Sequence, residues 1–332
     1  MTGRPALRQV RTRVFDSTRW QDYQPRPDDI IIATYSKCGT TWMQRIVSML
    51  IFGSAEPMPI WDLSPWPDMC LFGPIDATLA RAEAQTHRRF LKSHMPYDAL
   101  PVYDGVKFIH VARDGRDAAL SLHNHLCNFG QETYDQLDEM NRADPKFGDP
   151  YPRPPADPAA YFHEWISDEA YDSQGDPGAS YFHVENSYWA ARDDPNMLLV
   201  HYADLKRDRG AEMRRVADFL GIEIAESLWP ELIEAAGFDA MKREGDALIP
   251  EAKHLWGNDG ANRFFNKGKN GRWKDVVRMA DLDRYDAKMR EAFSPELADW
   301  IENGRSSPAT RDRQPRQAQP TMPATDAHSG LR

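Results

Sequence analysis

The stretch DIIIATYSKCGTTW, residues 29–42, decides the fold of this chain. Its first part, 29–34, is short, apolar and rich in β-branched residues, which is typical of a buried parallel strand. Apolar residues then recur at helical spacing, at Met43, Ile46, Val47, Leu50 and Ile51. The segment between them is a strand-to-helix turn, where free N–H groups and the helix dipole attract a phosphate. A Walker A loop places its lysine after a second glycine, whereas Lys37 precedes the only glycine here, so the turn indicates a mononucleotide site without the usual NTPase chemistry.

The composition is that of a soluble globular protein, with 332 residues of which 41% are hydrophobic and 28% charged. The net charge of −10 argues against nucleic acid or an anionic membrane as a partner, so an anionic cofactor needs a local basic pocket. Three widely spaced cysteines predict a reducing compartment and no disulfide or zinc framework. Without an apolar leader or a long apolar run, the sequence predicts a cytoplasmic protein with no integral membrane contact.

Strand-like and helical patterns alternate along the chain, which predicts a single α/β domain with a mostly parallel central sheet flanked by helices. Strands are expected at 29–34, 90–92, 107–112 and 196–202, and helices at 42–52, 115–125, 159–170, 180–192 and 209–220. The proline-rich segment 143–158 predicts a surface loop of the kind that often serves as a lid. We expect a flexible, loosely packed arm at 1–20, the domain at 21–303 and a disordered tail at 304–332.

Four further segments carry chemistry after the first turn: FLKSHMP at 90–96, KFIHVARDGRD at 107–117 followed by Ser121, the end of the strand at Tyr202, and FFNKGKNGRWK at 264–274. These five motifs, in this order, resemble the cytosolic-type sulfotransferases. Those enzymes move a sulfuryl group from 3′-phosphoadenosine-5′-phosphosulfate (PAPS) to an acceptor and release the 3′,5′-bisphosphate PAP. The likeness covers about residues 28–300 and is greatest to bacterial members that sulfate small molecules or glycolipids. It implies a P-loop-like sulfotransferase fold and no metal.

The resemblance assigns roles to individual residues. It implies that the turn grips the 5′-phosphosulfate, that adenine stacks on an aromatic residue, and that basic residues hold the 3′-phosphate. In that scheme His94 is the general base, Lys37 stabilises the leaving phosphate, and Lys92 contacts the transferring group. The cofactor-binding set is Lys37, Cys38, Gly39, Thr40, Thr41, Trp42, Arg113, Ser121, Tyr202, Phe238, Asn266, Lys267 and Gly268.

Structural roles compete with several of these assignments. Trp42 is either a core residue or an adenine contact, or both, and Tyr202 and Phe238 are divided between packing and binding. A lone histidine such as His94 more often has a structural role, but Lys92 and Pro96 beside it favour catalysis. Arg113 could pair with Asp114 or Asp117, and Ser121 could face water, although a basic residue just past a parallel strand lies on the ligand-binding edge of the sheet. His123 and His125 are expected on the surface or in the acceptor pocket.

Two departures from the family pattern are visible. Asn266 stands where the family often has arginine, so one contact to the 3′-phosphate is expected to be absent unless Arg263, Lys269 or Arg272 replaces it. Cys38 stands where serine is common. A thiol at a helix N-terminus should have a lowered pKa, so we expect alkylation of Cys38 to inactivate the enzyme; the alternative is that Cys38 only fills space.

The expected acceptor is a small hydrophobic phenol or alcohol, or a glycolipid hydroxyl. An aromatic wall is expected from Trp61, Trp66, Phe72, Phe129, Tyr134, Tyr161, Trp165, Tyr188 and Trp189, under cover of the 130–158 loop and the helices near 165 and 185. A homodimer is a further expectation, although the family's usual dimer segment has no clear match after Lys274. The rival hypotheses are a small-molecule kinase, which would need a Walker A run, and a nucleotide-binding protein without activity.

Overall fold

Four parallel strands form the central sheet of the computed structural model, which describes residues 1–167 and 173–306. In spatial order they are β3 (Phe90–Ser93), β2 (Ile30–Ala33), β5 (Lys107–Ala112) and β6 (Met197–His201). Ile31 of β2 is in register with Leu91 of β3 and Phe108 of β5. Every residue of β2 is buried, as expected for a strand covered on both faces. The predicted fold class and all four predicted strands are therefore confirmed.

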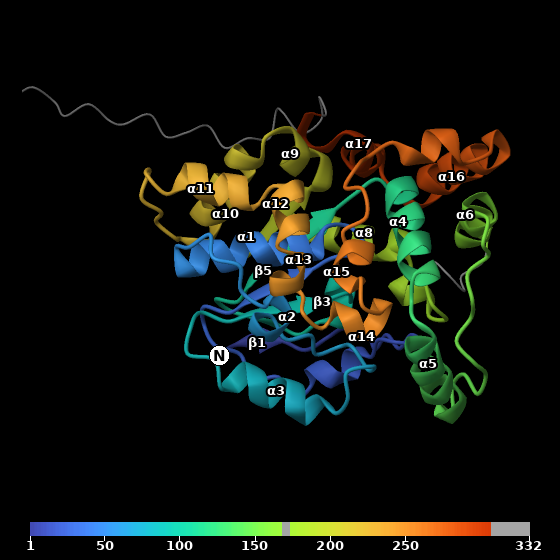
Figure 1. Cartoon of the computed structure of the whole chain (residues 1–332), viewed down its shortest axis with the longest axis horizontal. Coiled ribbons are helices and arrows are strands. Elements are labelled where there is room, and N and C mark those ends of the chain that lie inside the picture. The colour runs from blue at the N-terminus through green and yellow to red at the C-terminus, as the bar shows by residue number, and fades with distance from the viewer. Residues whose placement is uncertain (168–172, 307–332) are drawn as a thin grey trace, which may run out of the picture.

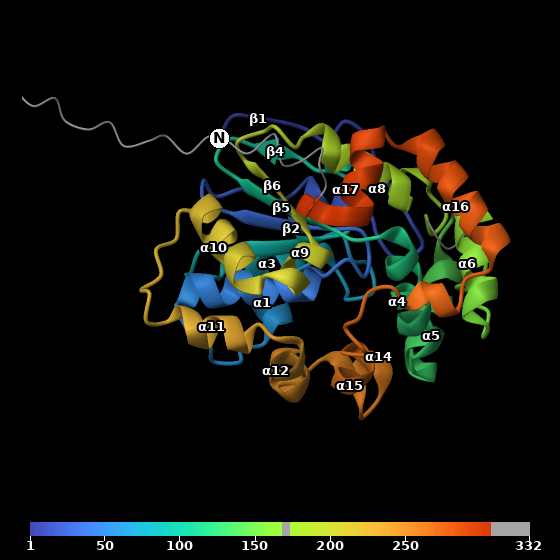
Figure 2. The ribbon, with the colours of Figure 1, turned by 90° about the horizontal axis from the view of Figure 1, so that it is seen from above.

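Helices cover both faces of this sheet (Figures 1 and 2). Ile30 and Ile32 pack with α1 (Thr40–Phe52), α10 (Arg209–Leu220) and α11 (Trp229–Ala235) on one face. The residues that point the other way contribute to a larger core with α4 (Gly115–Cys127), α6 (Pro158–Ser167), α8 (Tyr181–Ala190), α16 (Met279–Ala292) and α17 (Pro295–Asn303). This alternation follows from the two-residue period of a strand.

A third cluster of helices lies apart from these two layers, in front of the sheet in Figure 1. It is built from short elements around Trp256 and Ile60, namely α2 (Ile60–Leu63), α12 (Phe238–Arg243), α13 (Gly245–Leu248), α14 (Ala252–Trp256) and α15 (Gly260–Phe264). Trp42 and Phe129 pack against this cluster from the main domain. The cluster therefore adjoins the beginning of α1 and the end of α4, which lie near the carboxyl ends of the strands.

The predicted helices match α1, α4, α6, α8 and α10 within a few residues, and the end of the helix expected at 159–170 lies outside the described residues. Two differences concern the site. Residues 131–143, expected as part of a covering loop, form helix α5 (Gln131–Ala143), while 144–157 contains no helix or strand. Tyr202 begins α9 (Tyr202–Arg207) instead of ending a strand. The rest of the regular structure comprises α3 (Ile75–Glu83) and the short pair β1 (Gly3–Arg4) and β4 (Val102–Tyr103).

The N-terminal segment differs from the loosely packed arm that we expected. Gly3 and Arg4 pair in antiparallel fashion with β4, and Val10 and Trp20 are fully buried or nearly so, at 0% and 1% exposure. Its apolar residues alternate with arginines that form ion pairs at the surface, for example Arg13 with Asp149. The polar composition of residues 1–20 predicted a loosely packed arm, because the arginines outnumber the buried apolar residues that hold the segment against the domain. The expected disordered tail begins at 304, and its part from 307 onward lies outside the described residues.

Within residues 1–167 and 173–306, no helix combines the length and the apolar character that a bilayer crossing requires.

Candidate active site

The turn between β2 and α1 has a backbone shaped for an anion. Lys37 and Gly39 both have positive φ angles, of 68° and 111°. Gly39 is the N-cap of α1 and supplies no side-chain cap, so the N–H groups of the first turn are left for a ligand. A side chain at Gly39 would also meet the Tyr202 ring at 3.0 Å. The glycine is therefore required both by its conformation and by the close approach of Tyr202.

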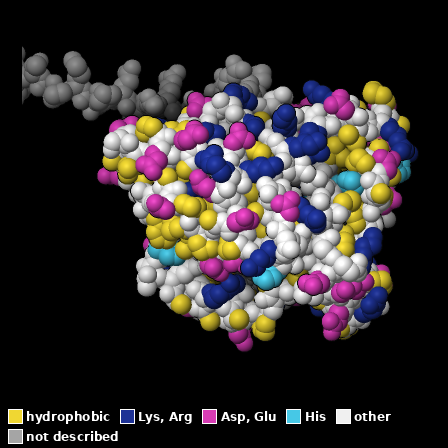
Figure 3. Space-filling model, viewed as in Figure 1, with side chains coloured by type: hydrophobic (Ala, Val, Ile, Leu, Met, Phe, Trp, Pro, Cys, Tyr) yellow, Lys and Arg dark blue, Asp and Glu magenta, His cyan; other side chains and the backbone are white. Residues whose placement is uncertain are grey.

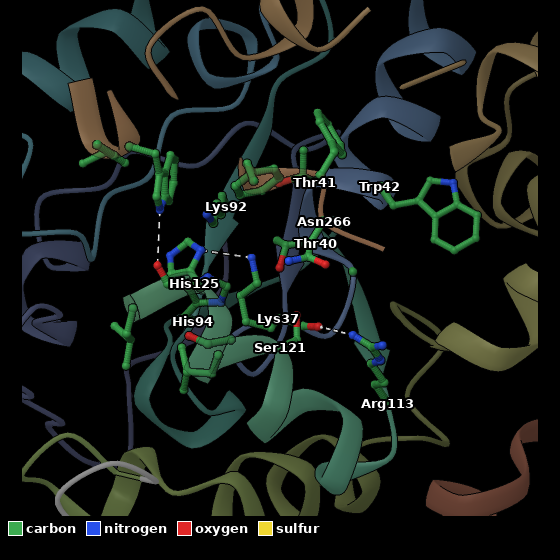
Figure 4. A pocket seen from close by; sticks show the side chains of 18 of the residues that line it. Lys37, Thr40, Thr41, Trp42, Lys92, His94, Arg113, Ser121, His125 and Asn266 are labelled. Atoms are coloured by element: carbon green, nitrogen blue, oxygen red, sulfur yellow. Dashed lines mark hydrogen bonds between the residues drawn. The ribbon is translucent and has the colours of Figure 1, made fainter. Parts of the chain in front are cut away.

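Two lysines and two histidines converge beside this turn (Figure 4). Burial, followed by repulsion from Arg113, lowers the pKa of Lys37 to about 7. Burial, followed by repulsion from Lys37, lowers the pKa of Lys92 to about 7. The Lys92 ammonium lies 3.3 Å from the centre of the Trp66 ring, and Lys37 lies 4.4 Å from the centre of the Phe264 ring. An anion placed between these amines would favour their charged forms and thereby bind more tightly.

The imidazole of His94 has a fixed tautomer. Its Nδ1 lies 2.8 Å from the carbonyl oxygen of Thr34, which can only accept, so Nδ1 carries the proton and Nε2 keeps a lone pair. Burial, followed by repulsion from Lys92, holds the pKa of His94 well below its usual value. His94 is therefore a neutral base at pH 7, the form in which an imidazole can take a proton from a hydroxyl.

A buried carboxylate that the sequence reasoning missed holds His94 in place. Asp68 accepts hydrogen bonds from the backbone N–H of His94 at 3.0 Å and from the indoles of Trp20 and Trp66 at 3.0 and 2.9 Å. The Trp66 ring in turn packs edge-on against the His94 ring, with 4.8 Å between ring centres. No local sequence signal marks Asp68, because two of its partners, His94 and Trp20, lie 26 and 48 residues away along the chain.

Arg113 joins the turn between β2 and α1 to the late loop, the segment of the 264–274 motif that follows α15. Its guanidinium donates to the carbonyl oxygen of Lys37 at 3.1 Å and to the side-chain oxygen of Asn270 at 3.1 Å, and it lies over the Tyr202 ring at 4.2 Å. Its Nε is fully buried and has no partner among the described residues. A buried N–H without a partner is costly, and since Arg113 lines the cavity, this Nε is available to an acceptor atom of a ligand.

The late loop is fastened to the domain by a second carboxylate. Asp117 accepts hydrogen bonds from the backbone N–H of Gly271 at 2.8 Å and of Arg272 at 3.3 Å. Asp117 therefore shapes the loop, and its charge also interacts with that of Arg113, as the competing interpretation expected. Gly268, at φ 57°, lies so close to Phe238 that a side chain there would meet the ring at 2.4 Å.

Three aromatic residues, Trp42, Tyr202 and Phe238, line the same part of the site. The rings of Trp42 and Tyr202 meet edge to face with 5.3 Å between centres, and the Trp42 indole donates to the carbonyl oxygen of Ala236 at 2.8 Å. Trp42 also packs against two apolar clusters, so its packing and binding interpretations are compatible. Figure 4 shows Trp42 pointing away from the lysine and histidine group, which leaves two separate ends to the site.

A single cavity of about 220 Å³ collects these parts. Of the residues that we expected at the site, those that line it are Lys37, Gly39, Thr40, Thr41, Trp42, Lys92, His94, Arg113, Ser121, Tyr202, Phe238, Asn266, Lys267 and Gly268. Lys206, Lys269 and Arg272 also line the cavity, whereas Arg263 does not. The Asn266 amide bonds Asn124 at 2.5 Å, and of the three basic residues expected to compensate for the missing arginine, Lys269 and Arg272 line the cavity. In the view of Figure 3, which is that of Figure 1, lysine and arginine side chains are spread across the upper part of the molecular surface, although the net charge of the chain is −10.

The apolar wall of the cavity is only partly the one expected. Trp61, Trp66, Phe72 and Phe129 do line it. The expectation was wrong for five others, which do not: Tyr134, Tyr161, Trp165, Tyr188 and Trp189. The wall is completed by residues that were not expected there, including Phe15, Tyr151, Trp256, Phe264 and several leucines. Aromatic content alone could not separate cavity residues from core residues. Four of these rings pack in or against the core from α6 and α8, and Tyr134 packs against it from α5.

Cys38 is a correction as well. It is fully buried in the core, and burial, followed by the charge of Glu185, raises the pKa of its thiol well above the usual value. This direction is opposite to the lowered pKa that we expected at a helix N-terminus, because the thiol lies in an apolar core cluster. The placement favours the alternative that Cys38 fills space.

We therefore expect a thiol reagent to label Cys127, which is exposed, well before Cys38 in the native protein. Peptide mass mapping over time would measure both rates. Labelling of Cys38 as fast as Cys127 would contradict the buried placement.

Comparison with known proteins agrees with this geometry. Residues 27–297 match the model of the sulfotransferase domain. The chain belongs to the sulfotransferase family. It is 33% identical to a glycolipid sulfotransferase of Mycobacterium bovis, over 92% of this chain and 96% of that protein. It is 29% identical to cytosolic sulfotransferase 1 of Danio rerio, over 82% of this chain and 84% of that protein.

Solved structures show the same sulfotransferase fold. A mouse sulfotransferase complexed with PAP matches with a TM-score of 0.63 at 18% identity, over 87% of this chain and 92% of that one. Retinol dehydratase in complex with androsterone and PAP matches with a TM-score of 0.61 at 21% identity, over 85% and 87%. The family resemblance seen in the five motifs is thus confirmed, and the chain is a sulfotransferase enzyme.

Proposed function

We propose that this sulfotransferase moves a sulfuryl group from PAPS to a hydroxyl of a small hydrophobic acceptor or a glycolipid. The observation that carries the proposal is the two-ended cavity, in which an anion cradle with three aromatic residues adjoins a neutral imidazole and an apolar wall. The unpartnered Nε of Arg113 and the two positive-φ glycines, Gly39 and Gly268, fit a nucleotide with two phosphate ends. The PAP bound to related structures supports the same donor.

Each residue then has a task. Arg113, Ser121, Lys267 and Gly268 hold the 3′-phosphate, and the first turn of α1 holds the 5′-phosphosulfate. His94 Nε2 takes the proton of the acceptor hydroxyl as the new oxygen–sulfur bond forms. The bond from sulfur to the bridging oxygen breaks, and its electron pair stays on the phosphate, where Lys37 stabilises the charge. Lys92 contacts the group in transfer.

The acceptor enters along the apolar wall beside His94. A hydrocarbon or aromatic body buried there would contribute most of the binding energy, while the amines and the His94 imidazole fix the hydroxyl. The mycobacterial relative is named a glycolipid sulfotransferase, which favours a glycolipid acceptor. The relative from Danio rerio is named a cytosolic sulfotransferase, which favours a cytoplasmic location. The three free cysteines agree with a cytoplasmic location.

Incubation of the protein with labelled PAPS and a panel of phenols, alcohols and lipid extracts tests the proposal. We expect label on an acceptor and stoichiometric release of PAP, measured by mass spectrometry, with no loss on addition of EDTA. Binding of PAP without transfer to any acceptor would instead favour the binding protein without activity, and dependence on added metal would favour the kinase hypothesis.

The lowered pKa values of the two lysines make a separate prediction. Lys37 and Lys92 each have a pKa of about 7 in the free enzyme, so at pH 8 both are mostly neutral. A bound bisphosphate favours their charged forms, so PAP binding at pH 8 should take up protons, and PAP affinity should fall as pH rises through 7. Calorimetry in two buffers of different ionisation enthalpy measures this uptake. We expect the proton uptake to decrease in Lys37→Met. Binding of PAP to the wild type without proton uptake would contradict the placement of the two lysines beside the bound bisphosphate.

A further inference from the structure

The second imidazole of the site belongs to His125, on the last turn of α4. Its Nδ1 lies 3.1 Å from the Lys37 amine, and Figure 4 shows it beside Lys37 and His94. The ring packs between aromatic residues of the apolar wall, with centre-to-centre distances of 4.8 Å to Trp256 and 5.1 Å to Phe129. The mechanism above assigns no task to this residue.

The contact with Lys37 decides which ring nitrogen of His125 is a donor. A bound anionic donor favours the charged form of Lys37, and an ammonium can only donate, so in that state Nδ1 accepts from Lys37 and the ring proton lies on Nε2. No described residue accepts a hydrogen bond from this Nε2, and the atom is not fully buried. Since His125 lines the cavity, Nε2 faces its open space. The two imidazoles therefore have opposite polarity: His94 offers a lone pair and His125 offers an N–H.

A simple alcohol, with one hydroxyl on a hydrocarbon body, would form a hydrogen bond with only one of the two imidazoles. Its single oxygen would meet His94, while its body would cover the N–H of His125 and leave that group without water or a partner. An acceptor with a second oxygen next to the reacting hydroxyl satisfies both rings, because one oxygen donates to His94 and the other accepts from His125. Sugars and glycols carry such neighbouring oxygens, whereas simple alcohols do not.

We propose that His125 is a specificity-determining residue whose Nε2–H binds an acceptor oxygen next to the hydroxyl that is sulfated. The substrate class is therefore a sugar-like or glycol-like hydroxyl on a hydrophobic body. This inference rests on the proposed sulfuryl transfer and deepens it, since it selects among hydroxyl acceptors of similar size and hydrophobicity.

The test compares two pairs of acceptors that differ by one exchange of CH₂ for oxygen. One pair is 2-(octyloxy)ethanol and 1-undecanol, and the other is 2-methoxyphenol and 2-ethylphenol. Each molecule has only one hydroxyl, so the position of transfer is unambiguous. We expect kcat/KM to be about tenfold higher for the oxygen-containing member of a pair, the size of effect that one hydrogen bond in a water-poor site can give.

Two variants separate the acceptor contact from the contact with Lys37. His125→Phe keeps the ring but removes both nitrogens, whereas His125→Asn places a side-chain oxygen near the position of Nδ1 and cannot reach as far as Nε2. In both variants the preference within each pair should fall to about one. The rate with either member should be higher in His125→Asn than in His125→Phe, because the former still accepts from Lys37.

Each outcome bears on a different claim. Wild-type transfer with equal kcat/KM within both pairs, or a preference that survives in His125→Phe, would overturn the role of His125 and leave the sulfotransferase assignment intact. Absence of transfer to all four acceptors would contradict the proposed small-acceptor function itself, and the inference with it. PAP affinity measured for each variant verifies that the nucleotide site is unchanged.

Discussion

Replacing His94 with asparagine should lower kcat by about 10²–10⁴-fold, the range that a lost general base typically gives. The asparagine amide can still donate to the carbonyl oxygen of Thr34, which His94 Nδ1 bonds at 2.8 Å, so the fold and the shape of the site should persist. PAP affinity should change by less than about twofold, since the imidazole acts on the acceptor. Steady-state kinetics and calorimetry with PAP measure the two effects separately.

The pH dependence of the wild-type enzyme belongs to the same prediction. Because the pKa of His94 is held well below its usual value, the base stays neutral through the physiological range. The acidic limb of kcat should therefore have its midpoint below the ordinary histidine pKa, with activity lost only as pH falls through the lowered value. His254→Ala, a change at an exposed histidine on α14, serves as the matched control and should retain activity. Unchanged turnover in His94→Asn would assign the base to another residue.

Replacing Lys37 with methionine should lower kcat by about 10²–10³-fold, comparable to the loss of one preorganised donor for a developing oxyanion. Methionine keeps most of the apolar stem of the side chain and removes only the amine. PAP affinity should fall less than kcat, since the charge on the bridging oxygen appears only as the bond to sulfur breaks. Equal losses in PAP affinity and in kcat would indicate that Lys37 binds the nucleotide without a specific effect on the transition state.

The backbone at Lys37 offers an independent measurement. Its φ of 68° is unfavourable for any residue with a side chain, by about 1–2 kcal/mol, and glycine avoids that cost. Lys37→Gly should therefore be inactive and yet as stable as the wild type, or more stable, by thermal unfolding. The exposed Lys253→Met is the control for a simple loss of charge, and it should leave both kcat and stability unchanged.

The sheet and the nucleotide turn could be predicted from sequence because their signals are local. The run of β-branched residues at 30–32 and the helical spacing after Thr41 depend on neighbours within a few residues, and each of the five motifs is a short local pattern. Parallel strands bring their carboxyl ends to one edge, so the position of Arg113 just past a strand predicted that it would lie at the ligand-binding edge, while the site roles of Lys37 and His94 came from the family resemblance. The structure places all three around one cavity.

What could not be predicted depends on contacts between distant parts of the chain. Asp68 accepts hydrogen bonds from His94 and Trp20, which lie far from it in the sequence. The burial of Cys38 depends on how the turn between β2 and α1 packs against the core. The acceptor wall shows the same limit: Trp66 and Trp165 are equally aromatic in sequence, but Trp66 lines the cavity and Trp165 bonds Tyr35 in the core. The contact of His125 with Lys37, from which its tautomer in the donor-bound state is inferred, joins residues 88 positions apart.

The central claim is that one cavity holds both phosphate ends of an adenosine bisphosphate next to the His94 base. Isothermal titration of the protein with PAP tests it most directly. We predict saturable one-to-one binding that weakens at least tenfold in Arg113→Ala, whose guanidinium stands beside the late loop with its Nε unpartnered. Absence of heat and of any thermal stabilisation by PAP, at concentrations up to the millimolar range, would contradict the account.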